Sequence, residues 1–191
     1  WVNSTAFAHD IYYEGLCYNI ISETDDIHKD VEVTYFGESG DYYYSGEVNI
    51  PEKFIQDGIL YTVKSIGSCA FQDCSSLTSI IIPSSVTNIG EHAFQRCASL
   101  TSVTIPSSVT RIEWEAFDLC TSLTSVSIPS SVKILGPAAF GNCSSLQSVS
   151  MSSGVDTIDV YAFGNCTALE SIDIPSSVKS IGEQAFVNCR S

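Results

Sequence analysis

The chain has 191 residues, of which 44% are apolar, and its 22 acidic and 8 basic side chains give a formal net charge of −14. This is the composition of a folded chain of about one domain. The acidity argues against binding to nucleic acid or to an anionic membrane surface, because eight scattered basic residues form no basic patch. The sequence also contains no apolar run long enough to insert in a membrane.

Residues 1–47 are predicted to form an antiparallel β cap. Tyrosine, valine and isoleucine alternate with polar residues in short runs, which is typical of two or three strands, and turns are expected at 25–26 and 38–41. The segment contains ten acidic residues and one lysine, a net charge of −9. We therefore expect any partner that binds through charge to bind at this end.

Residues 48–191 are predicted to form a solenoid whose first coil, 48–76, is irregular. Residues 48–51 read V-N-I-P and repeat the strand end of the later coils. Fifteen residues then separate Pro51 from Ile66, whereas six separate Pro83 from Ile89 in the next coil. This coil therefore carries a nine-residue insertion around residues 56–58.

Residues 77–191 are five regular registers of 23 residues without an insertion. An Ala-Phe pair and a following cysteine recur at this spacing, from Phe71 and Cys74 to Phe186 and Cys189. Written from its leucine, the unit reads L-x-x-I-x-I-P-S-S-V-x-x-I-G-x-x-A-F-x-x-C-x-x. A fixed period of this length indicates stacked repeats.

The spacing inside the unit indicates how each coil folds. The two isoleucines of I-x-I lie two residues apart, which is the period of a strand, and the proline that follows ends the hydrogen-bonded ladder. One coil cannot bury its apolar side alone, so coils are expected to stack about 4.8 Å apart and to form a continuous parallel sheet. The predicted fold class is a β-rich solenoid.

The L-x-x-I-x-I-P, V-x-x-I-G and A-F-x-x-C elements resemble the BspA-like (Treponema-type) leucine-rich repeat of bacterial surface proteins. The strict repeat covers 115 of the 191 residues. The resemblance implies a leucine-rich-repeat right-handed superhelix of 23-residue coils. It also implies a secreted or surface-anchored protein that acts in adhesion or protein binding.

Six of the eight cysteines occupy one position of the repeat and are predicted to form a row of buried free thiols. In-register side chains point the same way and form a line, which argues against disulfides and against a tetrahedral zinc site. Cys17 and Cys69 lie outside this row, and a bridge between them stays open as an alternative. The six are Cys74, Cys97, Cys120, Cys143, Cys166 and Cys189.

No catalytic, metal or cofactor site is predicted. The three histidines, at positions 9, 28 and 92, lie outside any nucleophile or metal motif. The repeated serine pairs, such as Ser107 and Ser108, follow a proline and have the composition of a turn. We therefore expect that the chain is not an enzyme.

Side chains that alternate with the inward residues of each strand are expected to project from the parallel sheet as a strip of hydroxyls, which is the candidate binding face. The alternative is that serine and threonine serve only as solvated strand formers. The strip consists of Ser79, Ile81, Ser102, Thr104, Ser125, Ser127, Ser148, Ser150, Ser171 and Asp173.

Two large aromatic residues are the other candidates for binding. Trp114 and Tyr161 stand just before Ala-Phe, where the unit usually has a polar or small residue. They are interpreted as part of a partner patch, and the alternative is that they pack against neighbouring coils.

The repeat and the lack of a catalytic constellation predict a non-enzymatic module that binds a protein or glycan, and the resemblance implies that this module is extracellular or at the cell surface, with a ligand of host or matrix origin. The alternative is a structural spacer or assembly module of a larger surface protein, which associates end to end through the C-terminal coil. Residues 186–189 complete that coil and no cap follows them in the sequence. A carbohydrate-binding or enzymatic domain is the less favoured third reading.

Overall fold

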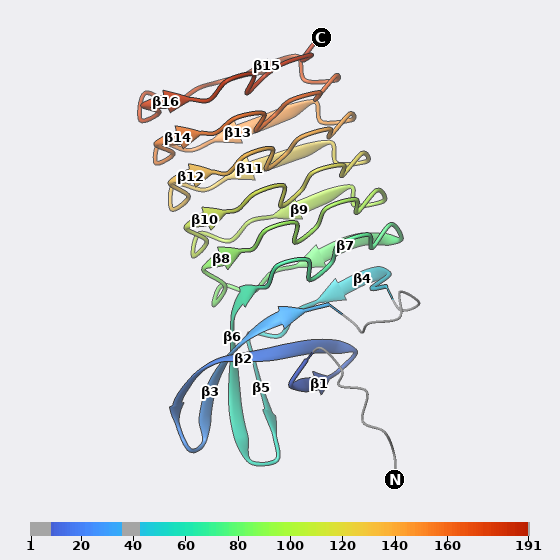
Figure 1. The fold of residues 1–191 in the computed structure, drawn as a ribbon, viewed down its shortest axis with the longest axis vertical. Helices are drawn as coiled ribbons and strands as arrows, with labels where there is room; N and C mark the ends of the chain where they lie inside the picture. Colours follow the sequence, from blue (N-terminus) through green and yellow to red (C-terminus); the bar gives the residue numbers. More distant parts are fainter. Residues whose placement is uncertain (1–8, 36–42, 191) are drawn as a thin grey trace.

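The computed structural model describes residues 9–35 and 43–190. In these ranges the chain consists of strands and turns, which form a stack of coils with a β cap at its N-terminal end (Figure 1). The Ala-Phe region of each coil forms a turn. Accordingly, none of the described residues belongs to a helix that could cross a membrane.

The cap begins with three antiparallel strands, as predicted: β1 (Ile11–Tyr13), β2 (Leu16–Asp25) and β3 (His28–Thr34). Glu14 and Gly15 connect the first two with φ values of 46° and 84°, which is the two-residue turn that glycine favours. The turn expected at 25–26 lies one residue later, at 26–27, and the Asp25 carboxylate at the end of β2 accepts a hydrogen bond from the Ile27 N–H. The turn expected at 38–41 lies outside the described residues.

The nine-residue insertion is a β-hairpin. Its strands are β5 (Lys53–Gln56) and β6 (Ile59–Ile66), and Asp57 and Gly58 form the turn with φ values of 52° and 78°. β6 also pairs in parallel with β3 of the cap and with β8 of the first regular coil. One sheet therefore joins the cap to the coils, while the division of the chain at residue 47 stays a prediction.

The sheet that contains β6 has ten strands and runs the length of the molecule in the order β1-β2-β3-β6-β8-β10-β12-β14-β16, with β5 paired to β6 (Figure 1). The repeat pattern predicted one parallel sheet and did not predict this one, because each coil contributes only two residues to it. These strands are β8 (Asn88–Ile89), β10 (Arg111–Ile112), β12 (Ile134–Leu135), β14 (Thr157–Ile158) and β16 (Ser180–Ile181).

The predicted parallel sheet is the second, six-stranded sheet, in the order β15-β13-β11-β9-β7-β4. Its ladders pair residues one repeat apart, so Ser125 lies opposite both Ser102 and Ser148. This register confirms the β solenoid of 23-residue coils. The strands are β4 (Gly46–Asn49), β7 (Leu77–Ile81), β9 (Ser102–Thr104), β11 (Ser125–Ile128), β13 (Ser148–Met151) and β15 (Ser171–Ile172).

A ladder of stacked phenylalanines forms the centre of the core. Neighbouring rings lie within 8° of parallel, and their centroids are 4.9 to 5.6 Å apart. All rings of the ladder are fully buried except that of Phe186 in the last coil, which is partly buried. The ladder consists of Phe71, Phe94, Phe117, Phe140, Phe163 and Phe186.

Two residues of each coil, on either side of Ala-Phe, have left-handed backbone conformations. Asn142, Asn165 and Asn188 occupy one of these positions in the last three coils with φ between 55° and 60°, and asparagine tolerates this region better than most residues. Leu119 occupies the same position with φ 60°. The turn geometry is therefore imposed by the stack, even where the residue is unsuited to it.

Candidate functional site

The exposed face of the six-stranded sheet carries the predicted strip of hydroxyls. Every predicted residue of the strip is exposed except Ser79, which is half-buried, and Asp173 directly follows β15. Register places them in two columns, because Ser125 lies between Ser102 and Ser148, and Ser127 lies opposite Ser150. The structure thus places the strip as the alternation predicted, and its role in binding stays a prediction.

β4 extends both columns by one residue that the sequence did not assign. Glu47 pairs with Ser79 and Asn49 pairs with Ile81, and both are exposed. The signal was present, because V-N-I-P at 48–51 copies the strand end of the repeat. The strip therefore runs over six strands from Glu47 to Asp173.

The middle of the strip is hollowed into a shallow depression of about 350 Å³ over β9, β11 and β13. Its exposed lining is hydroxyls, each of which can donate and accept hydrogen bonds. It contains no aromatic or arginine side chain of the type that dominates binding energy at interfaces. It is lined by Ser102, Val103, Thr104, Ser125, Val126, Ser127, Ser148, Val149 and Ser150.

Trp114 and Tyr161 lie away from the strip, in the turns that follow β10 and β14 of the ten-stranded sheet. Their exposed fractions are 46% and 41%. The Trp114 ring lies 4.9 Å from that of His92 in the preceding coil, and the Tyr161 hydroxyl donates to Gln184 in the following coil. Each aromatic therefore packs on a neighbouring coil and remains exposed, and its part in a partner patch stays a prediction.

A buried polar network that the sequence did not reveal lies next to Trp114. The Asp118 carboxylate, 5% exposed, accepts hydrogen bonds from the Asn142 amide at 2.7 Å and from the Gln95 amide at 3.2 Å. Gln95 also donates to Glu115, and its oxygen accepts from Gln72 at 2.6 Å. Because its donors come from side chains one coil away on either side, this network links coils and serves the fold.

Six of the eight cysteines are buried, and Cys69 and Cys189 are partly buried. All eight are free thiols, so a bridge between Cys17 and Cys69 is wrong. In the row, the thiols of Cys97, Cys120, Cys143, Cys166 and Cys189 each donate to a phenylalanine carbonyl at 3.1 to 3.3 Å. Burial raises the pKa of Cys120 and Cys166 to about 12, which keeps them protonated. Across 9–35 and 43–190 the structure also contains no group of residues that could hold a metal ion.

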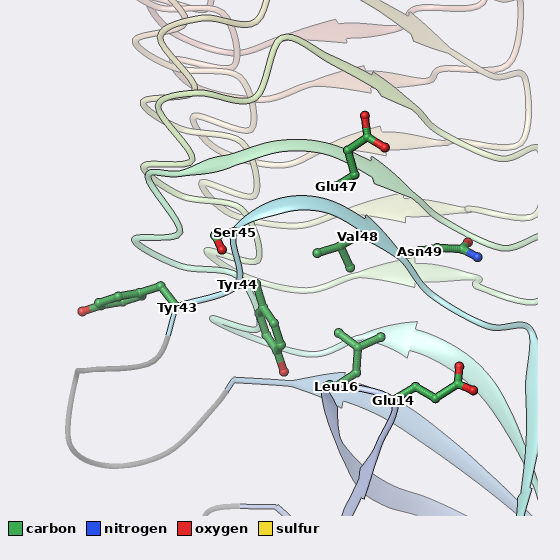
Figure 2. A pocket seen from close by; sticks show the side chains of 9 residues that line it. Glu14, Leu16, Tyr43, Tyr44, Ser45, Glu47, Val48 and Asn49 are labelled. Atoms are coloured by element: carbon green, nitrogen blue, oxygen red, sulfur yellow. The ribbon is translucent and has the colours of Figure 1, made fainter.

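A second hollow, of about 310 Å³, lies where the cap meets the six-stranded sheet. Figure 2 shows the side chains of Leu16, Tyr44 and Val48 converging in the gap between β4 and the start of β2, with Glu14 and Asn49 to one side. The remaining lining residues are Gly15, Tyr43, Ser45 and Glu47. The sequence did not assign this hollow, because it depends on how the cap meets the first coil.

Comparison with known proteins gives one family. The model of the BspA type leucine rich repeat region matches residues 64–191 in six copies. No curated protein has a matching sequence.

Three solved structures are similar over almost the whole chain. A leucine-rich repeat protein from Bacteroides ovatus is 32% identical (TM-score 0.68, 95% of this chain and 51% of that one). A leucine rich cell surface protein from Faecalibacterium prausnitzii is 30% identical, with a TM-score of 0.65 over 93% of this chain and 52% of that one. The pneumococcal vaccine antigen PcpA is 25% identical, with a TM-score of 0.74 over 93% of this chain and 47% of that one. The chain thus spans about half the length of these relatives. The six-copy match and the shared fold show that the chain belongs to the BspA-type leucine-rich repeat family.

Proposed function

We propose that the chain is a non-enzymatic extracellular or cell-surface module that binds a protein ligand across the strip of the six-stranded sheet. The observation that carries this function is the in-register face of two columns of exposed side chains over six parallel strands. Between Glu47 and Asp173 both columns are uncharged, so an elongated ligand meets a surface of hydrogen-bonding groups that only the exposed Ile81 interrupts.

The chemistry of the described residues supports binding rather than catalysis. The thiols of the row are buried with raised pKa values, and the described histidines lie on β3, before β1 or in the turn after β8. The serines of the strip therefore have no histidine base on their own sheet. The names of two relatives, a cell surface protein and a vaccine antigen, support a location at the surface of a bacterium.

The test is a binding screen against extracellular matrix and cell-surface proteins, with a glycan array in parallel. Ser127→Arg places a long charged side chain in the middle of the strip, and Ser180→Arg makes the same change at an exposed position of β16 on the other sheet. We expect saturable binding to a protein that weakens at least about tenfold in Ser127→Arg and not in Ser180→Arg. Binding to glycans alone, or equal affinity in both variants, would contradict this function.

A further inference from the structure

We propose that the outer edge of β4 binds an extended peptide with basic side chains, which joins the six-stranded sheet as an additional strand. This site adjoins the start of the strip at Glu47 and Asn49, but it uses the backbone edge of the sheet and not its exposed face. The peptide would lie over the hollow between β4 and the β1–β2 turn.

The first support is the backbone of β4. It is the last strand of its sheet and pairs with β7 alone among the described strands. Gly46 and Ile50 donate their N–H groups toward the β7 side, to Ser76 and Ile81. Because successive residues of a strand face opposite sides, Glu47 and Asn49 direct their N–H and C=O groups to the outer edge. Four backbone groups are thus available to a peptide.

The second support is the uncovered apolar surface beside this edge. Val48 is half-buried, whereas Ile80 and Val103 at the same position of β7 and β9 are 5% and 7% exposed. The difference arises because a strand lies on both sides of β7 and β9, but on only one side of β4. The hollow of about 310 Å³ adjoins Val48, Leu16 and Tyr44 (Figure 2), and its volume is of the size of small-ligand pockets.

The third support is charge. Glu14 and Glu47 line the hollow, both are exposed, and no lysine or arginine lines it. Residues 1–47 carry a net charge of −9. An exposed edge of this kind attracts cationic peptides and repels acidic ones, and main-chain hydrogen bonds then supply sequence-tolerant affinity. An alternating basic and apolar peptide fits both the carboxylates and the apolar floor.

Fluorescence anisotropy with a labelled octapeptide of alternating lysine and valine tests the site. We expect saturable binding that weakens with salt, and much weaker binding of the glutamate–valine analogue. Hydrogen exchange of the assigned backbone amides gives a separate readout, because strand addition should slow exchange at Glu47 and Asn49 by about tenfold or more. Exchange that is unchanged on binding, or that is already slow without peptide, would overturn strand addition.

Variants distinguish this edge from general attraction to an acidic protein. Glu14→Asn with Glu47→Gln removes both carboxylates, and asparagine suits the positive φ of residue 14. Glu170→Gln with Asp173→Asn removes two exposed carboxylates from the other end of the molecule. We expect about tenfold weaker binding in the first pair and no change in the second. Equal loss in both pairs would overturn the site.

A third variant separates this site from the strip. Ser127→Arg should leave peptide binding unchanged, because this residue lies on the exposed face of β11. Loss of peptide binding in Ser127→Arg would place the peptide on the strip and overturn the edge site. The test of the edge site does not depend on the proposed function of the strip, because peptide binding at β4 is measured whether or not the strip binds a protein.

Discussion

Truncation of the phenylalanine ladder at its middle should destabilise the protein about twice as much as truncation at its end. Phe117 is fully buried, and its ring stacks on Phe94 at 4.9 Å and on Phe140 at 5.1 Å. Removal of a buried phenylalanine ring costs about 3–5 kcal/mol, and about 0.5–1.5 kcal/mol of this belongs to each aromatic contact. We expect Phe117→Ala to lower the free energy of unfolding by about 4 kcal/mol.

Phe186 is the matched comparison. It is partly buried, and its single ring partner is Phe163 at 5.6 Å. Phe186→Ala should therefore cost about 2 kcal/mol, since it loses one ring contact and less buried area. Urea unfolding, monitored by circular dichroism, measures the free energy of unfolding of both variants. Equal losses for the two variants, or a loss below about 1.5 kcal/mol for Phe117→Ala, would refute a core held by the stacked rings.

Three further predictions concern single side chains. The partly buried thiols of Cys69 and Cys189 should react with a thiol reagent first. The fully buried thiols, such as Cys120, should react only on unfolding, because burial shields them from the reagent and raises their pKa values. Peptide mapping after labelling measures the order of reaction. Glu32→Gln should stabilise the protein at neutral pH, because partial burial raises the pKa of the Glu32 carboxyl and penalises its charged form. The gain should disappear below about pH 4, where the carboxyl is protonated in both states. Leu119→Asn should add about 0.5–1 kcal/mol to the free energy of unfolding, because it relieves a leucine at φ 60°.

Each of these has a contrary outcome. Rapid labelling of Cys120 in the folded protein would contradict inert thiols, and a pH-independent gain in Glu32→Gln would contradict a titrating carboxyl. Thr121→Asn, at a residue of the same turn outside the left-handed region, is the control for Leu119→Asn. An equal gain in both would trace the effect to asparagine itself.

The sequence predicted the parts of the fold that repeat, because the buried position inferred for an isoleucine or a phenylalanine in one unit holds for the same residue of every coil. It did not predict the second sheet, since β8 and its equivalents are two residues long and carry no alternation of their own. The Asp57-Gly58 pair between alternating runs is a hairpin signal, whereas the comparison of coil lengths alone indicates only an insertion. The outward positions of the strip followed from the two-residue alternation of side chains in a strand. The hollow at β4 depends instead on how the cap packs against the first coil, which no repeated pattern describes.

A uniform strip raises the question of what fixes a ligand along it. A ligand that contacts only the serine columns gains almost the same hydrogen bonds after a shift by one coil, so these contacts alone do not define its position. The columns are not uniform, because Glu47 and Asn49 lie on β4, Ile81 on β7 is 63% exposed, and Asp173 follows β15. A shift moves a ligand onto or off these residues, which changes charge and apolar contact at once. For the proposed ligand, the position along the strip therefore depends on the residues that differ from the repeated serines, while the serines contribute contact area.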